Sequence, residues 1–84
     1  MKRPELEFPL QWEYKIIAAH SSETYDAICG VVAEHGFSHT PRASNVSRNG
    51  KYITYSLCLH MTSREQLDGL TRAFAQCEGV KYLL

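Results

Sequence analysis

The side chains best suited to metal chemistry in this sequence are four histidines and three cysteines. A zinc site needs three or four such ligands that converge on one point. The chain has no CxxC or HxH unit. His35 and His39 are four residues apart, but Gly36 lies between them and should end a helix there, so the two would not share a helical face. We therefore predict no metal site and no cofactor.

Nucleophilic catalysis would need an activated cysteine or serine. Cys29 and Cys77 fall on apolar helical stripes that we assign to the core, where a thiol is inert. Cys58 and His60 are two residues apart on a predicted strand, so they point to one face without being placed to exchange a proton. The sequence also lacks a nucleophile elbow, a GxGxxG pattern and a P-loop. We therefore expect a protein that is not an enzyme.

Length and charge exclude further classes. A chain of 84 residues is one domain, and its nine basic residues balance nine acidic ones, so the molecule lacks an overall field that would attract polyanions. No apolar run approaches the roughly 18 residues of a membrane span. The three cysteines are odd in number and widely separated, as is typical of reduced thiols. We predict a cytoplasmic protein without a membrane partner.

The first half of the chain reads as a strand, a helix and a weak strand. Residues 12–19 alternate in polarity with a period of two, typical of a half-buried strand. Ser21, or the serine after it, is placed to cap a helix whose apolar residues recur every three or four positions until Gly36. The polar stretch 37–49 contains proline, which cannot donate to a sheet ladder, so we expect a short, poorly formed edge strand.

A hairpin opens the second half. Asn49 and Gly50 form the dipeptide typical of a tight two-residue turn, in which both residues have a positive φ. The following residues, 52–61, alternate strictly between a face of large apolar side chains and a mixed face. This pattern predicts a central strand with one side in the core.

A second helix and a last strand complete the chain. The segment TSRE, residues 62–65, fits a capping box in which the Thr62 hydroxyl caps the helix. We expect Gly79 to end this helix. Alternation in the closing VKYLL predicts a strand whose core-facing residues are Val80, Tyr82 and Leu84.

The order strand, helix, strand, strand, helix, strand favours an α+β fold of the ferredoxin-like βαββαβ type. In this sandwich, two helices cover one face of a four-stranded antiparallel sheet. The first and third strands should lie in the middle because they are the long apolar ones. We assign residues 1–10 to an extended N-terminal arm and residues 11–84 to the ferredoxin-like domain.

The open face of such a sheet is the candidate binding surface. Lys15, Ile17, Tyr52 and His60 should lie on it. Ile17, Tyr52, Cys58 and His60 make this face less polar than a solvated sheet requires, and Lys15 is a candidate anion contact. This pattern favours a non-enzymatic regulatory or accessory protein that binds a small molecule or a protein. Alternatively, these side chains simply tolerate solvent.

RNA binding is the alternative function. RNA-recognition domains share this order of strands and helices and stack bases on aromatic side chains of the two central strands. Tyr52 matches that pattern, but Thr54 stands where a second ring is expected, and the balanced charge weakens the phosphate contribution. We therefore place nucleic acid behind a small molecule or a protein as the partner.

Three segments carry a family resemblance: FPLQWEYKII from Phe8, SRNGKYITYS from Ser47 and the closing VKYLL. Together they resemble the DUF493 or YbeD-like (UPF0250) family of small bacterial proteins, over about Phe8 to Leu84. We interpret the signature positions as structural. They are Pro9, Tyr14, Lys15, Ser47, Gly50 and Tyr52.

The resemblance implies a fold close to the ACT regulatory domains and a regulatory or accessory role, with a link to lipoate metabolism suggested by gene neighbourhoods in the family. We expect a monomer or a weak homodimer. ACT domains that sense amino acids typically have glycine in the loop after the first strand, whereas this chain has His20, Ser21 and Ser22. Amino-acid binding of the usual kind is therefore not expected.

Overall fold

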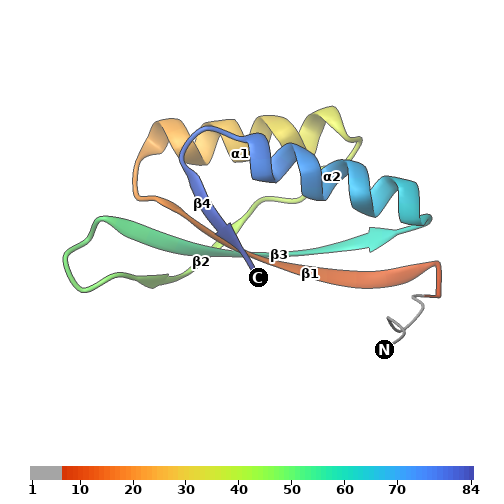
Figure 1. Cartoon of the computed structure of the whole chain (residues 1–84), viewed down its shortest axis with the longest axis horizontal. Coiled ribbons are helices and arrows are strands. Elements are labelled where there is room, and N and C mark those ends of the chain that lie inside the picture. Colours follow the sequence, from red (N-terminus) through yellow and green to blue (C-terminus); the bar gives the residue numbers. More distant parts are fainter. Residues whose placement is uncertain (1–6) are drawn as a thin grey trace.

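The computed structural model describes residues 7–84, which form four strands and two helices (Figure 1). In chain order these are β1 (Leu10–Ala19), α1 (Ser22–Glu34), β2 (Arg42–Val46), β3 (Tyr52–Met61), α2 (Arg64–Gln76) and β4 (Val80–Leu83). The predicted order of elements is confirmed. Of the predicted arm, residues 1–6 lie outside the described part, and Phe8 and Leu10 pack against the core.

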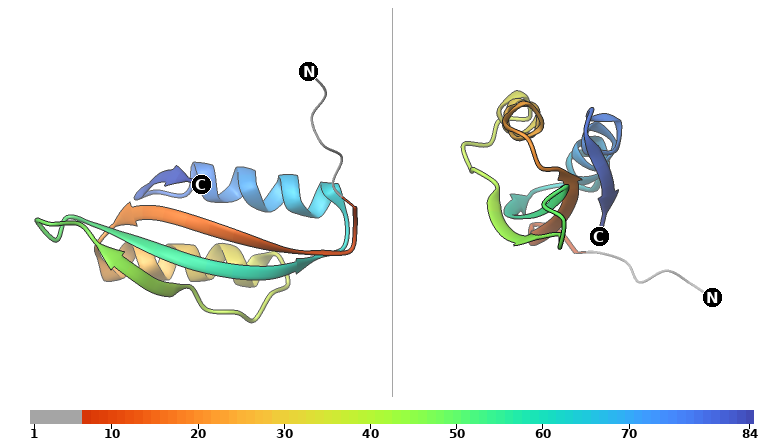
Figure 2. Two further views of the ribbon diagram at one scale, coloured as in Figure 1. Left: turned by 90° about the horizontal axis from the view of Figure 1, so that it is seen from below. Right: turned by 90° about the vertical axis from the view of Figure 1, so that its left-hand side faces the viewer.

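The sheet has the strand order β2-β3-β1-β4, and all three pairings are antiparallel. Both helices lie on one face of it (Figures 1 and 2). The two ten-residue strands β1 and β3 lie in the middle and pair along their whole length, from Leu10 opposite Met61 to Ala19 opposite Tyr52. This is the ferredoxin-like fold that the sequence predicts.

The core lies between the sheet and the helices, where the predicted alternation is confirmed. In β1, Tyr14, Ile16 and Ala18 are buried, and the intervening residues face the other way. The helices contribute most of the apolar stripes expected from their spacing, but the assignment of Cys29 and Cys77 to the core is wrong. Both are only half-buried, and Cys77 lies beyond the end of α2. The buried members of those stripes are Ile28, Val32, Leu67, Leu70 and Phe74.

The helix starts are set by serine caps. Ser21 caps α1, and its Oγ accepts from the backbone N–H of Thr24 at 3.2 Å, as predicted. The prediction for α2 is wrong by one residue, because Ser63 and not Thr62 is the cap, and its Oγ accepts from the N–H of Gln66 at 3.1 Å. The side-chain oxygen of Gln66 in turn accepts from the N–H of Thr62 at 2.8 Å. Gln66 thus reaches back to the residue before the cap and not to Ser63 itself, so the contact differs from the predicted capping box.

The turn between β2 and β3 is longer than predicted. Only Gly50 has a positive φ, +73°, and Asn49 does not, so the two-residue turn is wrong. The N–H of Ser47 donates to the carbonyl of Tyr52 at 2.9 Å, which leaves four residues in the connection. Longer hairpin loops are built on a turn that ends in one left-handed residue, and glycine fills that position.

The segment from α2 to β4 also differs from expectation. The helix ends at Gln76, three residues before Gly79, and Cys77 already has extended backbone angles. Gly79 instead serves the turn that follows, where its φ is +92° and an added Cβ would collide with the Thr24 side chain. Glycine is therefore required for close approach to α1 and not to end α2.

In β4, Val80 packs inward as predicted, but the residues after it face the opposite side of the sheet from the one predicted. Tyr82 pairs with Ile17, but Val80 pairs with Ala18, so a bulge leaves Lys81 as the extra residue. A bulge shifts the alternation by one position. As a result Leu83 packs on the core, whereas Tyr82 is 67% exposed and Leu84 is 74% exposed. The prediction that Tyr82 and Leu84 face inward is wrong.

Candidate binding face of the sheet

The sheet face opposite the helices is uncovered by other described residues (Figure 2). Residues directly opposite each other in antiparallel strands share a face, so the register defines its composition. One row across the sheet contains Arg42, Ser56, Lys15 and Leu84, and the next contains Asn45, Thr54, Ile17 and Tyr82. We call this surface the open face.

An aromatic patch occupies one end of the open face. It consists of Ile17, Tyr52, Lys81 and Tyr82, which line a shallow hollow of about 180 Å³. The amino group of Lys81 lies 5.9 Å from the centroid of the Tyr52 ring, within the range of a cation–π contact. The structure thus brings two of the predicted residues, Ile17 and Tyr52, into one cluster and adds two from β4.

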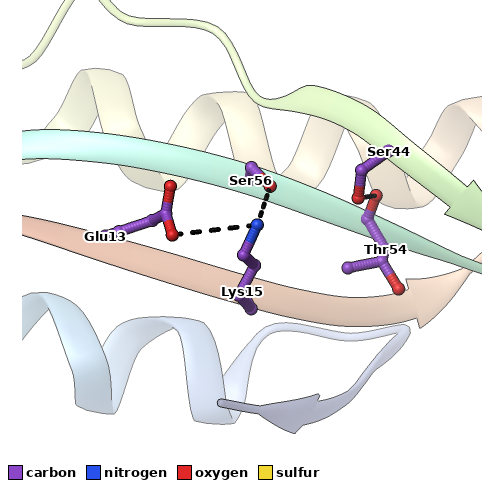
Figure 3. A network of polar contacts seen from close by, with 5 residues as sticks. All are labelled: Glu13, Lys15, Ser44, Thr54 and Ser56. Atoms are coloured by element: carbon purple, nitrogen blue, oxygen red, sulfur yellow. Dashed lines mark hydrogen bonds and ion pairs between the residues drawn. The ribbon is translucent and has the colours of Figure 1, made fainter.

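Lys15 lies beside this patch but makes polar contacts (Figure 3). Its Nζ donates to the Oγ of Ser56 at 2.7 Å and lies 3.7 Å from a carboxylate oxygen of Glu13. The two charged side chains are 42% and 58% exposed, so their ion pair is weak and open to competition. Lys15 is therefore available to a bound anion.

His60 is not part of this cluster. It is exposed, lies opposite Gln11, and is eight residues from Tyr52 along β3. At about 3.4 Å per residue in an antiparallel strand, that separation is on the order of 27 Å. The four predicted residues share one face, but His60 lies at its opposite end.

A second hollow, of about 350 Å³, lies between the aromatic patch and the His60 end, next to β2. We call it the polar hollow. Its lining residues are Glu13, His39, Thr40, Arg42, Ser56, Leu57 and Cys58.

Two signature positions have clear structural roles. Tyr14 is 2% exposed, and its hydroxyl donates to the carbonyl of Leu67 at 3.2 Å and lies 2.7 Å from the Oγ1 of Thr71, so it joins β1 to α2. Ser47 shapes the hairpin, where its Oγ accepts from the N–H of Tyr52 at 3.0 Å. Together with the positive φ of Gly50, these contacts explain why the fold needs these residue types.

Tyr14, Tyr55 and Cys77, which pack on the core side of the sheet, have raised pKa values. Burial raises the pKa of Tyr14 and Tyr55, and it raises the pKa of the Cys77 thiol with a smaller contribution from the neighbouring Glu78. These shifts keep the groups protonated near neutral pH. All three cysteines are free, and within residues 7–84 no three histidine, cysteine or acidic side chains are arranged to hold a metal.

Charge is unevenly distributed between the two layers. The strands and the turn 47–51 carry five basic side chains and one carboxylate, which is a net charge of +4. The two helices carry five acidic and two basic side chains, which is a net charge of −3. The balanced total of the whole chain therefore conceals a basic sheet layer and an acidic helical layer. Neither helix is long and apolar enough to cross a membrane.

Sequence reasoning missed three residues of the open face. Tyr82 and Lys81 were missed because a bulge reverses the alternation of β4, which its short sequence does not signal. Arg42 was missed because the register of β2 was not assigned. The five basic residues in strands and turn, against one acidic residue, were a signal that could have revealed the basic layer.

Comparison with known proteins agrees with the predicted resemblance. A family model described as a protein of unknown function, DUF493, matches residues 3–84. A UPF0250 protein of Shewanella amazonensis is 30% identical over 79 residues, covering 94% of this chain and 90% of that protein. An uncharacterised protein of Campylobacter jejuni, Cj0253, is 35% identical over 71 residues, covering 80% and 76%.

A solved structure shares the fold. The solution structure of protein HP0495 from H. pylori matches with a TM-score of 0.82 and 17% identity, covering 99% of this chain and 89% of that one. Identity this low shows the fold alone. The family match over nearly the whole chain, together with the relatives at 30% identity or more, shows that the protein belongs to the DUF493 family.

Proposed function

We propose that the protein is a non-enzymatic regulatory or accessory protein that binds a small molecule or a partner protein through the open face. The observation that carries this proposal is the aromatic patch. The bulge in β4 places Tyr82 beside Ile17, next to Tyr52, on a face that no helix covers. Apolar and aromatic side chains that gather on an exposed surface are typical of an interaction site.

The basic sheet layer supports the same proposal. Its net charge of +4 favours approach of an anionic ligand or an acidic protein surface, whereas the acidic helices would repel it. A cytoplasmic location is part of the proposal because the three cysteines are free, and cytosolic thiols stay reduced.

A nitrogen–proton correlation spectrum of the labelled protein tests the proposal. The ligand arm is a pool of amino-acid and lipoyl metabolites, chosen because the family resemblance suggests lipoate metabolism. We expect shifts at the amides of Ile17, Tyr52 and Tyr82, and their loss in the variant I17S/Y52S/Y82S. The matched control is V46S, because Val46 is also an exposed apolar residue, 51% exposed, but lies on the other edge strand.

Protein partners are covered by two further measurements. Size measured at several concentrations tests binding to a second copy, and recovery of partners from cells compares the triple variant with V46S. Three results together would show that the proposal is wrong. They are a metabolite pool that shifts no resonance, a protein that stays strictly monomeric, and a triple variant that changes no interaction in cells.

RNA binding remains the second candidate because Tyr52 and Tyr82 supply two rings in a basic layer. It ranks lower because Tyr82 is on an edge strand, whereas stacking in RNA-recognition domains uses the two central strands. Titration with short mixed-sequence RNA at low salt separates the candidates. Shifts at Lys15, Tyr52 and Tyr82 with RNA, and none with metabolites, would favour RNA over the first candidate.

A further inference from the structure

The polar hollow has the size and lining of a site for a small molecule. Its volume of about 350 Å³ is within the range of about 300–1,000 Å³ found for ligand pockets. The side chains around it present a guanidinium, an imidazole, two hydroxyls, a thiol and a carboxylate. This chemistry differs from that of the aromatic patch.

Two cations flank Ser56, one of the residues that line the polar hollow. Arg42 also lines the hollow, whereas Lys15 lies just outside its lining, in contact with Ser56. Arg42 on β2 and Lys15 on β1 are both register partners of Ser56 on β3, so the three side chains form one row on the open face. Neighbouring strands lie about 4.8 Å apart. The α-carbons of the two cations are therefore roughly 10 Å apart, and their long side chains can converge above Ser56.

The donors in this row are only partly used. Lys15 donates to the Oγ of Ser56, so the hydroxyl hydrogen of Ser56 remains free to donate to a ligand (Figure 3). Within residues 7–84, no carboxylate lies within ion-pair distance of Arg42. An incoming anion would thus meet a free guanidinium, a free hydroxyl and a lysine that is held only by a weak, exposed pair with Glu13.

We propose that the polar hollow binds a small ligand through a carboxylate or phosphate group, which sits above Ser56 between Arg42 and Lys15. Arg42 supplies the planar pair of donors that matches such a group, and Lys15 turns from Glu13 to the ligand. Glu13 acts as an internal competitor for Lys15. This inference rests on the proposed function of the open face and names the chemistry of one ligand.

The test is a titration of the full-length protein with acetate and, separately, with inorganic phosphate at constant ionic strength. Acetamide is the neutral control for acetate. We expect saturable shifts at the amides of Arg42, Ser56 and Cys58 with at least one of the two anions, and none with acetamide. The anion that binds more tightly identifies the group, and either one supports the proposal.

Three variants distinguish anion binding at this site from non-specific attraction of anions to the basic sheet layer. Arg42→Gln should raise the Kd at least about tenfold, because it removes hydrogen bonds to a charged group. Glu13→Gln should lower the Kd by about two- to fivefold, because it frees Lys15 from an exposed ion pair. Arg48→Gln removes the same charge from the turn and lies outside the hollow, so it should change the Kd by less than about twofold.

Several results would overturn the proposal: equal weakening by Arg48→Gln and Arg42→Gln, no gain from Glu13→Gln, or no saturable shift with either anion. The variant I17S/Y52S/Y82S distinguishes the two proposals because its substitutions lie outside the polar hollow. If it loses partner binding while the hollow binds no anion, the anion site alone is wrong. If the hollow binds anions and the triple variant changes no interaction, the role of the aromatic patch alone is wrong.

Discussion

At the scale of single residues, Tyr14 shows how a signature residue can be structural. Its ring packs edge-to-face on Phe74 with 5.1 Å between centroids, and its hydroxyl reaches the carbonyl of Leu67 and the hydroxyl of Thr71. Thr71 also donates to that carbonyl at 2.8 Å, so the acceptor keeps a partner if the tyrosine hydroxyl is removed. Tyr14 therefore fastens β1 to α2 and contributes nothing to the open face.

Tyr14→Phe should lower the free energy of unfolding by about 1 kcal/mol at neutral pH, which is the net value of a typical hydrogen bond. Chemical denaturation of the variant and the parent measures this difference. Tyr82→Phe is the matched control, since Tyr82 is 67% exposed and its hydroxyl should contribute little. Equal losses in both variants would contradict the role given to Tyr14.

The same residue predicts a pH dependence. Burial raises the pKa of Tyr14 above the ordinary 10.0, with a smaller contribution from Asp68, so the folded protein holds this proton at a pH where the unfolded chain releases it. Its contribution is complete below pH 10 and is lost as the pH rises through the folded pKa. Denaturation above pH 10 should show a smaller further loss of stability for Tyr14→Phe than for the parent. An identical loss would exclude ionisation of Tyr14 as a cause.

At the scale of elements, the turns around α2 decide how the two halves of the domain meet. Gly79 has a positive φ and faces Thr24 of α1 without room for a Cβ, whereas Gly69 lies inside α2 with open space around it. The two glycines therefore have opposite consequences for stability.

Gly79→Ala should lower the free energy of unfolding by about 1–3 kcal/mol through backbone strain alone, with the collision at Thr24 adding to it. Gly69→Ala should raise it by up to about 1 kcal/mol, because alanine favours the helix. Thermal and chemical denaturation of both variants measure these effects. A stabilising Gly79→Ala would show that this turn does not need glycine.

The start of α2 provides another comparison. Ser63→Ala should lower the free energy of unfolding by about 1 kcal/mol, because its Oγ accepts from the N–H of Gln66. Thr62→Ala should change it by no more than about 0.5 kcal/mol, because the exposed Thr62 hydroxyl contacts only the side chain of Gln66. If Thr62→Ala lowered the free energy of unfolding more than Ser63→Ala does, Thr62 and not Ser63 would be the cap.

The sequence predicts the elements and the sheet order because strand alternation and helical spacing depend on local residues and on burial. The prediction fails where one extra residue in a strand reverses which side chains face the core. In VKYLL the pattern is regular, but pairing with β1 inserts Lys81 as a bulge so that Val80 and Leu83 both reach the core. The dipeptide Asn49–Gly50 likewise predicts a tight two-residue turn. The pairing of β2 with β3 instead leaves four residues in the loop that connects the two strands.

At the scale of the whole molecule, the separation of charge distinguishes the two layers. The strands and the turn 47–51 are basic, the helices are acidic, and the total is zero. The predicted strands and helices were enough to reveal the two layers, but the register was needed to place Arg42 in one row with Lys15. Of the candidate site, the sequence identified Lys15, Ile17 and Tyr52, and the structure added the residues of β2 and β4 that complete it.

Because charge is separated between the two layers, the protein should be retained on both cation and anion exchangers near neutral pH and at low salt, although its net charge is zero. The double variant R48Q/K51Q should elute earlier from the cation exchanger and not from the anion exchanger. The matched double variant D26N/E34Q in α1 should show the opposite change. Chromatography at one pH measures both, and changes that do not depend on the layer would contradict the separation of charge.

The most direct test of the open face as the binding surface is photo-cross-linking in bacterial cells. A photoreactive amino acid replaces Tyr82 on the open face in one variant and Asp68, an exposed residue of α2, in another. We predict a discrete cross-linked product from position 82 that disappears when I17S/Y52S is added, and no product from position 68. A product from position 68 alone, or no product from either position, would contradict the assignment of binding to the open face.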